Sequence, residues 1–198
     1  MIELIYPYDI APVVPTPTAE TSIQHNAVSE WFPIVDPAGI VTGRSTRQYC
    51  HGGSKPLHPV IHIHIIDRYG CIYLQKRSMN KDIQPGKWDT AVGGHVDYGE
   101  EIETALRREA REELGITDYT PVFFLRYTYQ STREREVVND YYCIYDGDFN
   151  VDPVEIDEGR FWTREEIESQ ISTGIFTPQF SGELEKISTL WDKILKNK

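Results

Sequence analysis

The chain of 198 residues is long enough for one compact domain with its own core, with or without a modest extension. Hydrophobic residues make up 39% and charged residues 26%, a composition typical of folded rather than disordered proteins. A net charge of -11 argues against a nucleic-acid duplex or an anionic membrane as the partner. An acidic protein that handles phosphates must therefore recruit cations.

Three widely spaced cysteines, Cys50, Cys71 and Cys143, indicate neither a disulfide framework nor a paired-cysteine metal site. The first residues lack a basic segment followed by an apolar run and a cleavage site, and no apolar run is long enough to span a membrane. We therefore expect a cytoplasmic protein without a membrane partner. A homodimer is left open.

Residues 1–28 are rich in proline and show no helical period, so we predict an irregular N-terminal arm. Residues 29–198 are expected to form one domain. It begins with a hairpin of residues 30–35 and 40–44, and the connecting turn has the sequence Asp-Pro-Ala-Gly, in which proline presets one dihedral angle and glycine accepts a positive φ.

The rest of the chain combines several strands with few helices. The predicted strands cover residues 60–66, 71–76, 88–92, 121–129, 137–145 and 160–162. One helix is predicted at residues 101–114 and ends at Gly115, and two later helices start after Thr163 and at Thr177-Pro178. Without a repeat or a regular βαβ alternation, this order predicts an α/β (α+β) fold with a mixed β-sheet sandwiched between helices.

The predicted helix turns apolar residues and carboxylates toward the same side. Ile102 and Leu106 belong to an apolar stripe that should face the sheet. At about 100° per residue, Glu109 and Glu113 both fall within about 20° of Ile102. Like charges at this spacing repel, and burying them without partners would be strongly unfavourable.

Glu112 lies about 80° from Ile102, so that three carboxylates converge on one side of the helix. One interpretation is a solvated acidic face balanced by Arg107, Arg108 and Arg111. Because these arginines fall at about 140° to 240°, mostly on the other side of the helix, we favour a divalent cation. Mg²⁺ or Mn²⁺ is typically held by a few carboxylates together with substrate phosphates.

A glycine pair, Gly93-Gly94, precedes this helix. Two glycines let the backbone bend sharply and approach a ligand, and a main-chain carbonyl there could bind the metal. The alternative is an ordinary pair of loop glycines. The acidic helix that follows favours the ligand-binding interpretation.

Residues 94–116 match a longer pattern. Gly94, five residues, Glu100, seven residues, and then Arg-Glu-Ala-Arg-Glu-Glu-Leu-Gly-Ile resemble the Nudix box, in which the same fixed letters stand at the same spacing. Ala110 is smaller than the aliphatic residue of the pattern, which affects helix packing rather than chemistry. The resemblance implies the Nudix fold and a hydrolase that cleaves a diphosphate bond in a nucleoside-diphosphate-linked or similar small molecule.

The resemblance also implies roles for the residues of the box. The implied metal ligands are Glu109, Glu112 and Glu113, with the Gly93 carbonyl as a further ligand. Glu100 and Arg108 would form a supporting pair. The Mg²⁺ or Mn²⁺ ions would neutralise the diphosphate and activate a water molecule.

The base that accepts the proton of this water is not specified by the box alone. Glu112 is our choice, because it lies at the edge of the acidic cluster. A base from outside the box is the alternative, and the candidates are Glu134, Glu136, Asp140, Glu155, Asp157 and Glu158. Arg77 and Gly94 are candidate substrate-binding residues, although a surface role for Arg77 is equally compatible with the sequence. His62 and His64 share a strand face and either line the cavity or are hydrogen-bonded interior residues.

A second resemblance is to isopentenyl diphosphate isomerase. Histidines of that family bind a catalytic metal, and the corresponding residues here are His51, His58 and His95. Glu134 and Glu136 are similar to its later carboxylate pair. However, Gly93 stands where that family has a catalytic cysteine, and the full set of box glutamates is present. Hydrolysis is therefore preferred, and an isomerase-like enzyme or a non-catalytic nucleotide-binding module remains the alternative.

Overall fold

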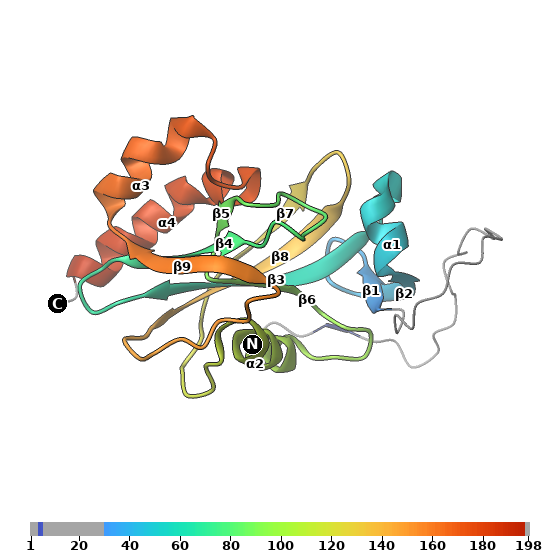
Figure 1. Cartoon of the computed structure of the whole chain (residues 1–198). Helices are drawn as coiled ribbons and strands as arrows, with labels where there is room; N and C mark the ends of the chain where they lie inside the picture. The colour runs from blue at the N-terminus through green and yellow to red at the C-terminus, as the bar shows by residue number, and fades with distance from the viewer. Residues whose placement is uncertain (1–3, 6–29, 197–198) are drawn as a thin grey trace. The chain divides into compact units, whose positions relative to one another are not determined.

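The structure is a computed structural model that describes residues 4–5 and 30–196. The predicted N-terminal arm falls almost entirely outside the described residues and stays a prediction. The described residues cluster into two compact units, the first within residues 1–61, 94–106 and 125–139, and the second within residues 62–93, 107–124 and 140–198. Several of the elements that are labelled in Figure 1 have residues in both units.

The first unit contains the predicted hairpin, formed by β1 (Trp31–Val35) and β2 (Val41–Thr46) in antiparallel pairing. Its turn has the predicted chemistry. Asp36 Oδ1 accepts the N–H groups of Ala38 at 2.9 Å and Ile40 at 3.0 Å, and Gly39 has a φ of 91°. A short α1 (Arg47–Tyr49) and a π-helical turn η1 (Cys50–Ser54) follow, and neither was predicted.

The strands of the larger sheet agree with the prediction to within a few residues, apart from one. They are β3 (Leu57–Ile66), β4 (Ile72–Arg77), β5 (Trp88–Asp89), β6 (Val92–His95), β7 (Val122–Gln130), β8 (Arg135–Ile144) and β9 (Ile156–Trp162). Their order is β5-β4-β3-β8-β7, with β6 paired to β3 and β9 paired to β4. Strand β3 is buried along its whole length, which explains why it is longer than the alternation of Ile and His predicts.

The prediction of one strand at residues 88–92 was wrong. The structure has two short strands there, and Gly93 and Gly94 lie inside β6 rather than in a bend that follows a strand. Neither glycine has a positive φ. A Cβ atom at Gly93 would lie 3.6 Å from the imidazole ring of His62, so a neighbouring side chain approaches this strand closely.

The described helices start and end near the predicted positions. They are α2 (Ile102–Leu114), α3 (Arg164–Gln170), the short η2 (Ile171–Thr173) and α4 (Pro178–Lys196). Thr163 forms a complete capping box with Glu166, and Gly115 ends α2 with a φ of 69°. No described helix is both long and apolar enough to cross a membrane.

Successive residues of β4 face opposite sides of the sheet in the second unit. Leu74 packs in a core cluster with Ile167 of α3 and Phe180 of α4. Gln75 instead hydrogen-bonds Glu113 of α2. Helical segments therefore cover both faces of the sheet in this unit, and the mixed α and β fold class is confirmed.

Candidate active site

Glu113 is the buried carboxylate of α2, with a residue exposure of 7%. Its Oε2 atom accepts hydrogen bonds from Gln75 Nε2 at 2.9 Å and from the main-chain N–H of Gly93 at 3.3 Å. Burial, and then the negative charge of Glu109, raise the pKa of Glu113 to about 8. An ionised carboxylate at this position is therefore unfavourable without a nearby cation.

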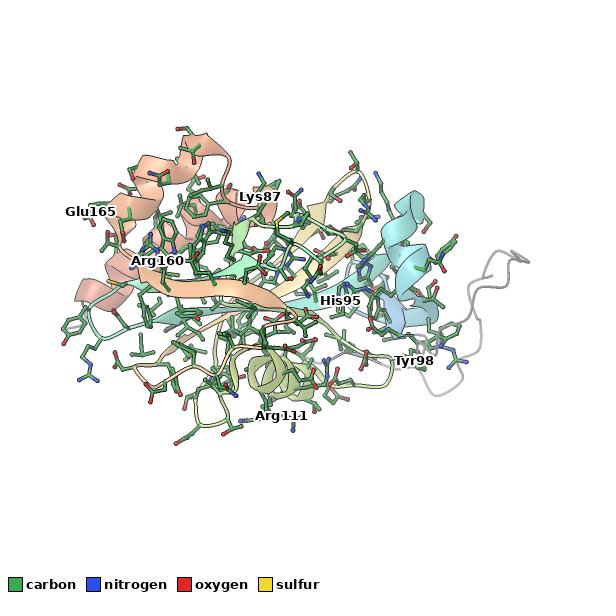
Figure 2. The ribbon with its side chains drawn as sticks, in the orientation of Figure 1. Lys87, His95, Tyr98, Arg111, Arg160 and Glu165 are labelled. Atoms are coloured by element: carbon green, nitrogen blue, oxygen red, sulfur yellow. The ribbon has the colours of Figure 1, made fainter. Side chains whose placement is uncertain are left out.

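Glu109 and Glu113 come together as predicted, because residues four apart lie on the same face of a helix. Glu112 is different. Its side chain is 51% exposed and lies 3.4 Å from Arg108 Nη1 and 3.8 Å from Arg111 Nη2. The structure thus places Glu112 on the outer side of the helix, where Figure 2 shows Arg111 pointing away from the sheet.

The arginines of α2 are closer to the carboxylates than the helical-wheel angles indicate. Arg108 Nη1 donates to Glu109 Oε1 at 2.7 Å and reaches Glu112 Oε2 at 3.4 Å. The expectation that the arginines lie apart from the acidic cluster was wrong for Arg108. A long side chain carries its charge well away from the direction of its own Cα atom.

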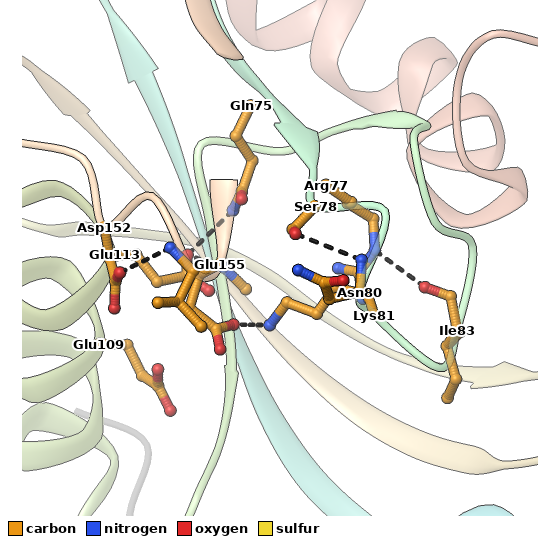
Figure 3. Close-up of polar contacts among 12 residues, drawn as sticks. Gln75, Arg77, Ser78, Asn80, Lys81, Ile83, Glu109, Glu113, Asp152 and Glu155 are labelled. Atoms are coloured by element: carbon orange, nitrogen blue, oxygen red, sulfur yellow. Dashed lines mark hydrogen bonds and ion pairs between the residues drawn. The ribbon is translucent and has the colours of Figure 1, made fainter. Parts of the chain in front are cut away.

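A cation from outside the helix also acts on this cluster. Lys81 lowers the pKa of Glu113, although burial and Glu109 outweigh it. Lys81 forms an ion pair with Glu155, and the main-chain N–H of Asp152 donates to the Glu113 carbonyl at 3.0 Å (Figure 3). Lys81 and Asp152, from two segments outside α2, therefore both interact with Glu113.

Gln75 and Lys81 were not predicted as site residues. Gln75 could have been noticed, because it is a polar residue that directly follows the buried residues Ile72 to Leu74 of β4. Lys81 lies in the polar stretch between β4 and β5, where nothing in the local pattern distinguishes it from other charged loop residues.

Other predicted site residues have well-defined local contacts. Arg77 Nε donates to the Ile83 carbonyl at 3.1 Å, and its Nη1 atom lies 3.5 Å from Asp89 Oδ2. These contacts hold the loop between β4 and β5. In the first unit, Glu100 Oε2 accepts the N–H of Asp97 at 3.0 Å, and Gly94 is buried in β6. The substrate role of Arg77 and the pairing of Glu100 with Arg108 stay predictions.

The three histidines of the second resemblance meet in the first unit. His51, His58 and His95 each present a ring nitrogen, and these atoms all lie within 4.8 Å of one another. The Nε2 atoms of His51 and His95 are 3.0 Å apart, and the ring of Phe32 stacks on His95 with a centroid distance of 4.3 Å. Figure 2 labels His95.

His58 is oriented for metal binding within this histidine cluster. Its Nδ1 atom donates to the Pro56 carbonyl at 2.9 Å, and its Nε2 lone pair has no hydrogen-bond partner within the described part of the chain. Burial lowers the pKa of His58 to about 4, so that the ring is neutral at pH 7. Glu134 Oε2 lies 3.7 Å from His51 Nε2. The cluster therefore has the donor atoms of a metal site.

The remaining candidates for the base have different surroundings. Glu134 and Glu136 are buried in the first unit, and Asp140 is buried beside His64 in the second. Asp157 accepts the N–H of Met79 at 3.3 Å, and Glu158 is exposed on β9. The surroundings of these residues do not identify any one of them as the base.

Comparisons with known proteins identify a family. Residues 56–180 match the NUDIX domain. An uncharacterized Nudix hydrolase of Yersinia pestis is 35% identical over 152 residues, which cover 77% of this chain and 82% of that protein. Isopentenyl-diphosphate Delta-isomerase of Brevibacterium linens is 26% identical over 148 residues, covering 72% and 81% of the two chains.

Solved structures agree on the fold. DR0079 from Deinococcus radiodurans has a TM-score of 0.68 and 24% identity, and the match covers 79% of this chain and 98% of that one. The NUDIX domain of Shewanella oneidensis NrtR, solved with ADP ribose, has a TM-score of 0.54 and 12% identity, and the match covers 68% and 87% of the two chains.

Proposed function

Because this chain belongs to the Nudix hydrolase family, we propose that it is a divalent-metal-dependent enzyme that cleaves the diphosphate bond of a nucleoside-diphosphate-linked or similar small molecule. The observation that supports this most directly is the environment of Glu113. A buried carboxylate with a pKa of about 8 lies beside Glu109, and both offer the oxygen donors that Mg²⁺ and Mn²⁺ prefer.

In the proposed site, Glu109 and Glu113 hold the metal ions, with the Gly93 carbonyl as a further ligand. Bound Mg²⁺ or Mn²⁺ would supply charge neutralisation of the diphosphate and an acidified water molecule. Gln75 and the Gly93 N–H fix the orientation of Glu113 through its Oε2 atom.

Arg108 Nη1 donates a charge-assisted hydrogen bond to Glu109 Oε1 and so restricts the position of this carboxylate. Arg108 also contacts Glu112, which we propose as the base, because its exposed carboxylate is accessible to water.

The first test is hydrolysis of a panel of diphosphates, including ADP-ribose, other nucleoside-diphosphate-linked compounds and prenyl diphosphates, with Mg²⁺ or Mn²⁺. We expect phosphorus NMR to show cleavage of at least one nucleoside-diphosphate-linked compound. Glu113→Gln should lower kcat by a factor of about 100 or more, because the neutral amide is a poorer metal ligand.

Glu101→Gln is the matched control, since this exposed residue at the start of α2 is outside the site and should keep wild-type turnover. Hydrolysis of no diphosphate at all, or turnover unchanged in Glu113→Gln, would overturn the proposal.

A second candidate function, isomerisation of a prenyl diphosphate, is favoured by the convergence of His51, His58 and His95. The relative from Brevibacterium linens supports it as well. Gly93 opposes it, because no thiol is present at the position where that family has its catalytic cysteine. An isomerised prenyl product in the same panel would favour this candidate, and its absence alongside hydrolysis would exclude it.

A further inference from the structure

A further group of candidate metal ligands lies in the second unit and shares no residue with the carboxylates of α2 or with the cluster of three histidines. His64 of β3, Asp140 of β8 and Glu183 of α4 each offer one ligand atom, and these atoms lie within 4.8 Å of one another. His64 Nε2 is 2.9 Å from Asp140 Oδ1 and 3.7 Å from Glu183 Oε2. All three residues are at most 1% exposed.

Glu183 occupies a core position of its helix. Phe180 and Ile187, which lie three residues before and four residues after it, are buried in the apolar cluster of the second unit. A carboxylate on such a stripe is costly unless a positive charge compensates it. His62 Nδ1 donates to Glu183 Oε1 at 3.0 Å, whereas Oε2 is directed toward His64.

The hydrogen bonds around His64 determine which of its nitrogen atoms faces the carboxylates as an acceptor. The Thr90 hydroxyl lies 2.9 Å from His64 Nδ1 and 3.3 Å from the Ile63 carbonyl. Its single hydrogen is needed for the carbonyl, so the hydroxyl accepts from Nδ1–H. A neutral His64 consequently presents its Nε2 lone pair toward Asp140 and Glu183.

A proton on Nε2 would satisfy this arrangement poorly. Nε2 lies 2.9 Å from Asp140 Oδ1, and among the described residues Asp140 Oδ2 accepts no hydrogen bond. One proton cannot point at two carboxylates, whereas a cation placed among the three groups contacts all of them.

We propose that His64, Asp140 and Glu183 bind a divalent transition metal, Zn²⁺ or Mn²⁺, as a structural site that fastens α4 to β3 and β8. One imidazole and two carboxylates suit these ions, and ligand atoms 2.9 and 3.7 Å apart can share an ion at about 2.0 to 2.2 Å. The hydrogen bond between Thr90 and His64 Nδ1 orients the imidazole ring so that Nε2 faces the carboxylates. Metal-binding histidines commonly form such a hydrogen bond through their second nitrogen atom.

The test uses the full chain carrying Glu113→Gln and His58→Ala, which disable the two other candidate metal sites. This protein is unfolded in chelator, refolded with Zn²⁺ or Mn²⁺, desalted and analysed for metal by mass spectrometry. We expect one retained ion per chain and a higher melting temperature than after refolding in chelator. Adding Asp140→Asn or Glu183→Gln should abolish both effects.

Glu185→Gln is the matched control, because this exposed residue lies on the same helix and outside the cluster. If Glu183→Gln does not fold, Thr90→Val keeps all three ligands and should weaken metal affinity about 10-fold to 100-fold. Absence of a retained ion in the refolded protein would overturn the proposal and leave a proton as the only occupant. Equal metal content in Asp140→Asn and Glu185→Gln would overturn it as well.

Discussion

Glu113 is held in one orientation by two donors while its surroundings oppose its negative charge. Gln75 and the Gly93 N–H favour the ionised form, but burial and Glu109 outweigh them. In the absence of metal, native Glu113 therefore keeps its proton at a pH at which the unfolded chain has lost it. This difference in proton binding makes the stability of the fold depend on pH.

The sign of this dependence follows from the raised pKa. Between about pH 4.5 and pH 8 the native state binds more protons at Glu113 than the unfolded state, so the free energy of unfolding should fall as the pH rises through this window. Urea denaturation in chelator at several pH values measures the slope. Glu113→Gln should reduce it and Glu101→Gln should not, and equal slopes in both variants would show that Glu113 is not the titrating group.

The site could be predicted only in part from single residues. The spacing of Glu109 and Glu113 determines that they share a helix face, so their proximity follows from the helix itself. The contact between Glu112 and Arg108 depends on which way the Arg108 side chain extends, and the contact of Gln75 with Glu113 depends on the packing of distant elements. Neither kind of information is present in local spacing.

At the scale of elements, boundaries were predicted best where one residue type has a special conformation. Thr163 begins α3 through its capping box, and Gly115 ends α2 with a positive φ. The break between β5 and β6 was missed because it has no such signal. It lies at Thr90, whose hydroxyl contacts His64 of another strand, and this is a tertiary interaction.

Gly115→Ala should lower the free energy of unfolding by about 1 kcal/mol or more. The backbone there has a φ of 69°, and a Cβ atom would lie 2.9 Å from the Cβ of Asn150. Gly182→Ala is the matched control, because Gly182 lies within α4 and, among the described residues, no atom beyond its chain neighbours and the backbone of its own helix lies within 4 Å of the added Cβ. That variant should be neutral or stabilised by up to about 1 kcal/mol, and equal destabilisation of both variants in urea would contradict the argument.

On the scale of the whole molecule, the net charge of -11 and the burial of carboxylates both lower the stability of the folded state, because both keep negative charges close together or away from water. Self-repulsion of an acidic chain is relieved by any salt, but a specific site responds to a divalent ion far below the concentration needed for general screening. Stability should therefore be coupled to metal binding more strongly than to ionic strength.

Melting temperatures measured in Mg²⁺ or Mn²⁺ test this coupling. One ion at about 100 times its Kd adds about 2.7 kcal/mol to the free energy of unfolding. We expect the melting temperature to rise well above that in sodium chloride of equal ionic strength, and Glu113→Gln to lose most of the Mg²⁺ effect. A rise that sodium chloride reproduces, or that Glu113→Gln retains, would argue against a specific site.

The main-chain hydrogen bond from Gly93 to Glu113 has a consequence for protein engineering. Because the donor belongs to the backbone, a new side chain at residue 93 would leave it in place. The φ of Gly93 is not positive, and an added Cβ would be in ordinary contact with His62 at 3.6 Å. Residue 93 is thus a position at which a thiol or another reactive group can be introduced beside Glu113 while the hydrogen bond that orients this carboxylate is retained.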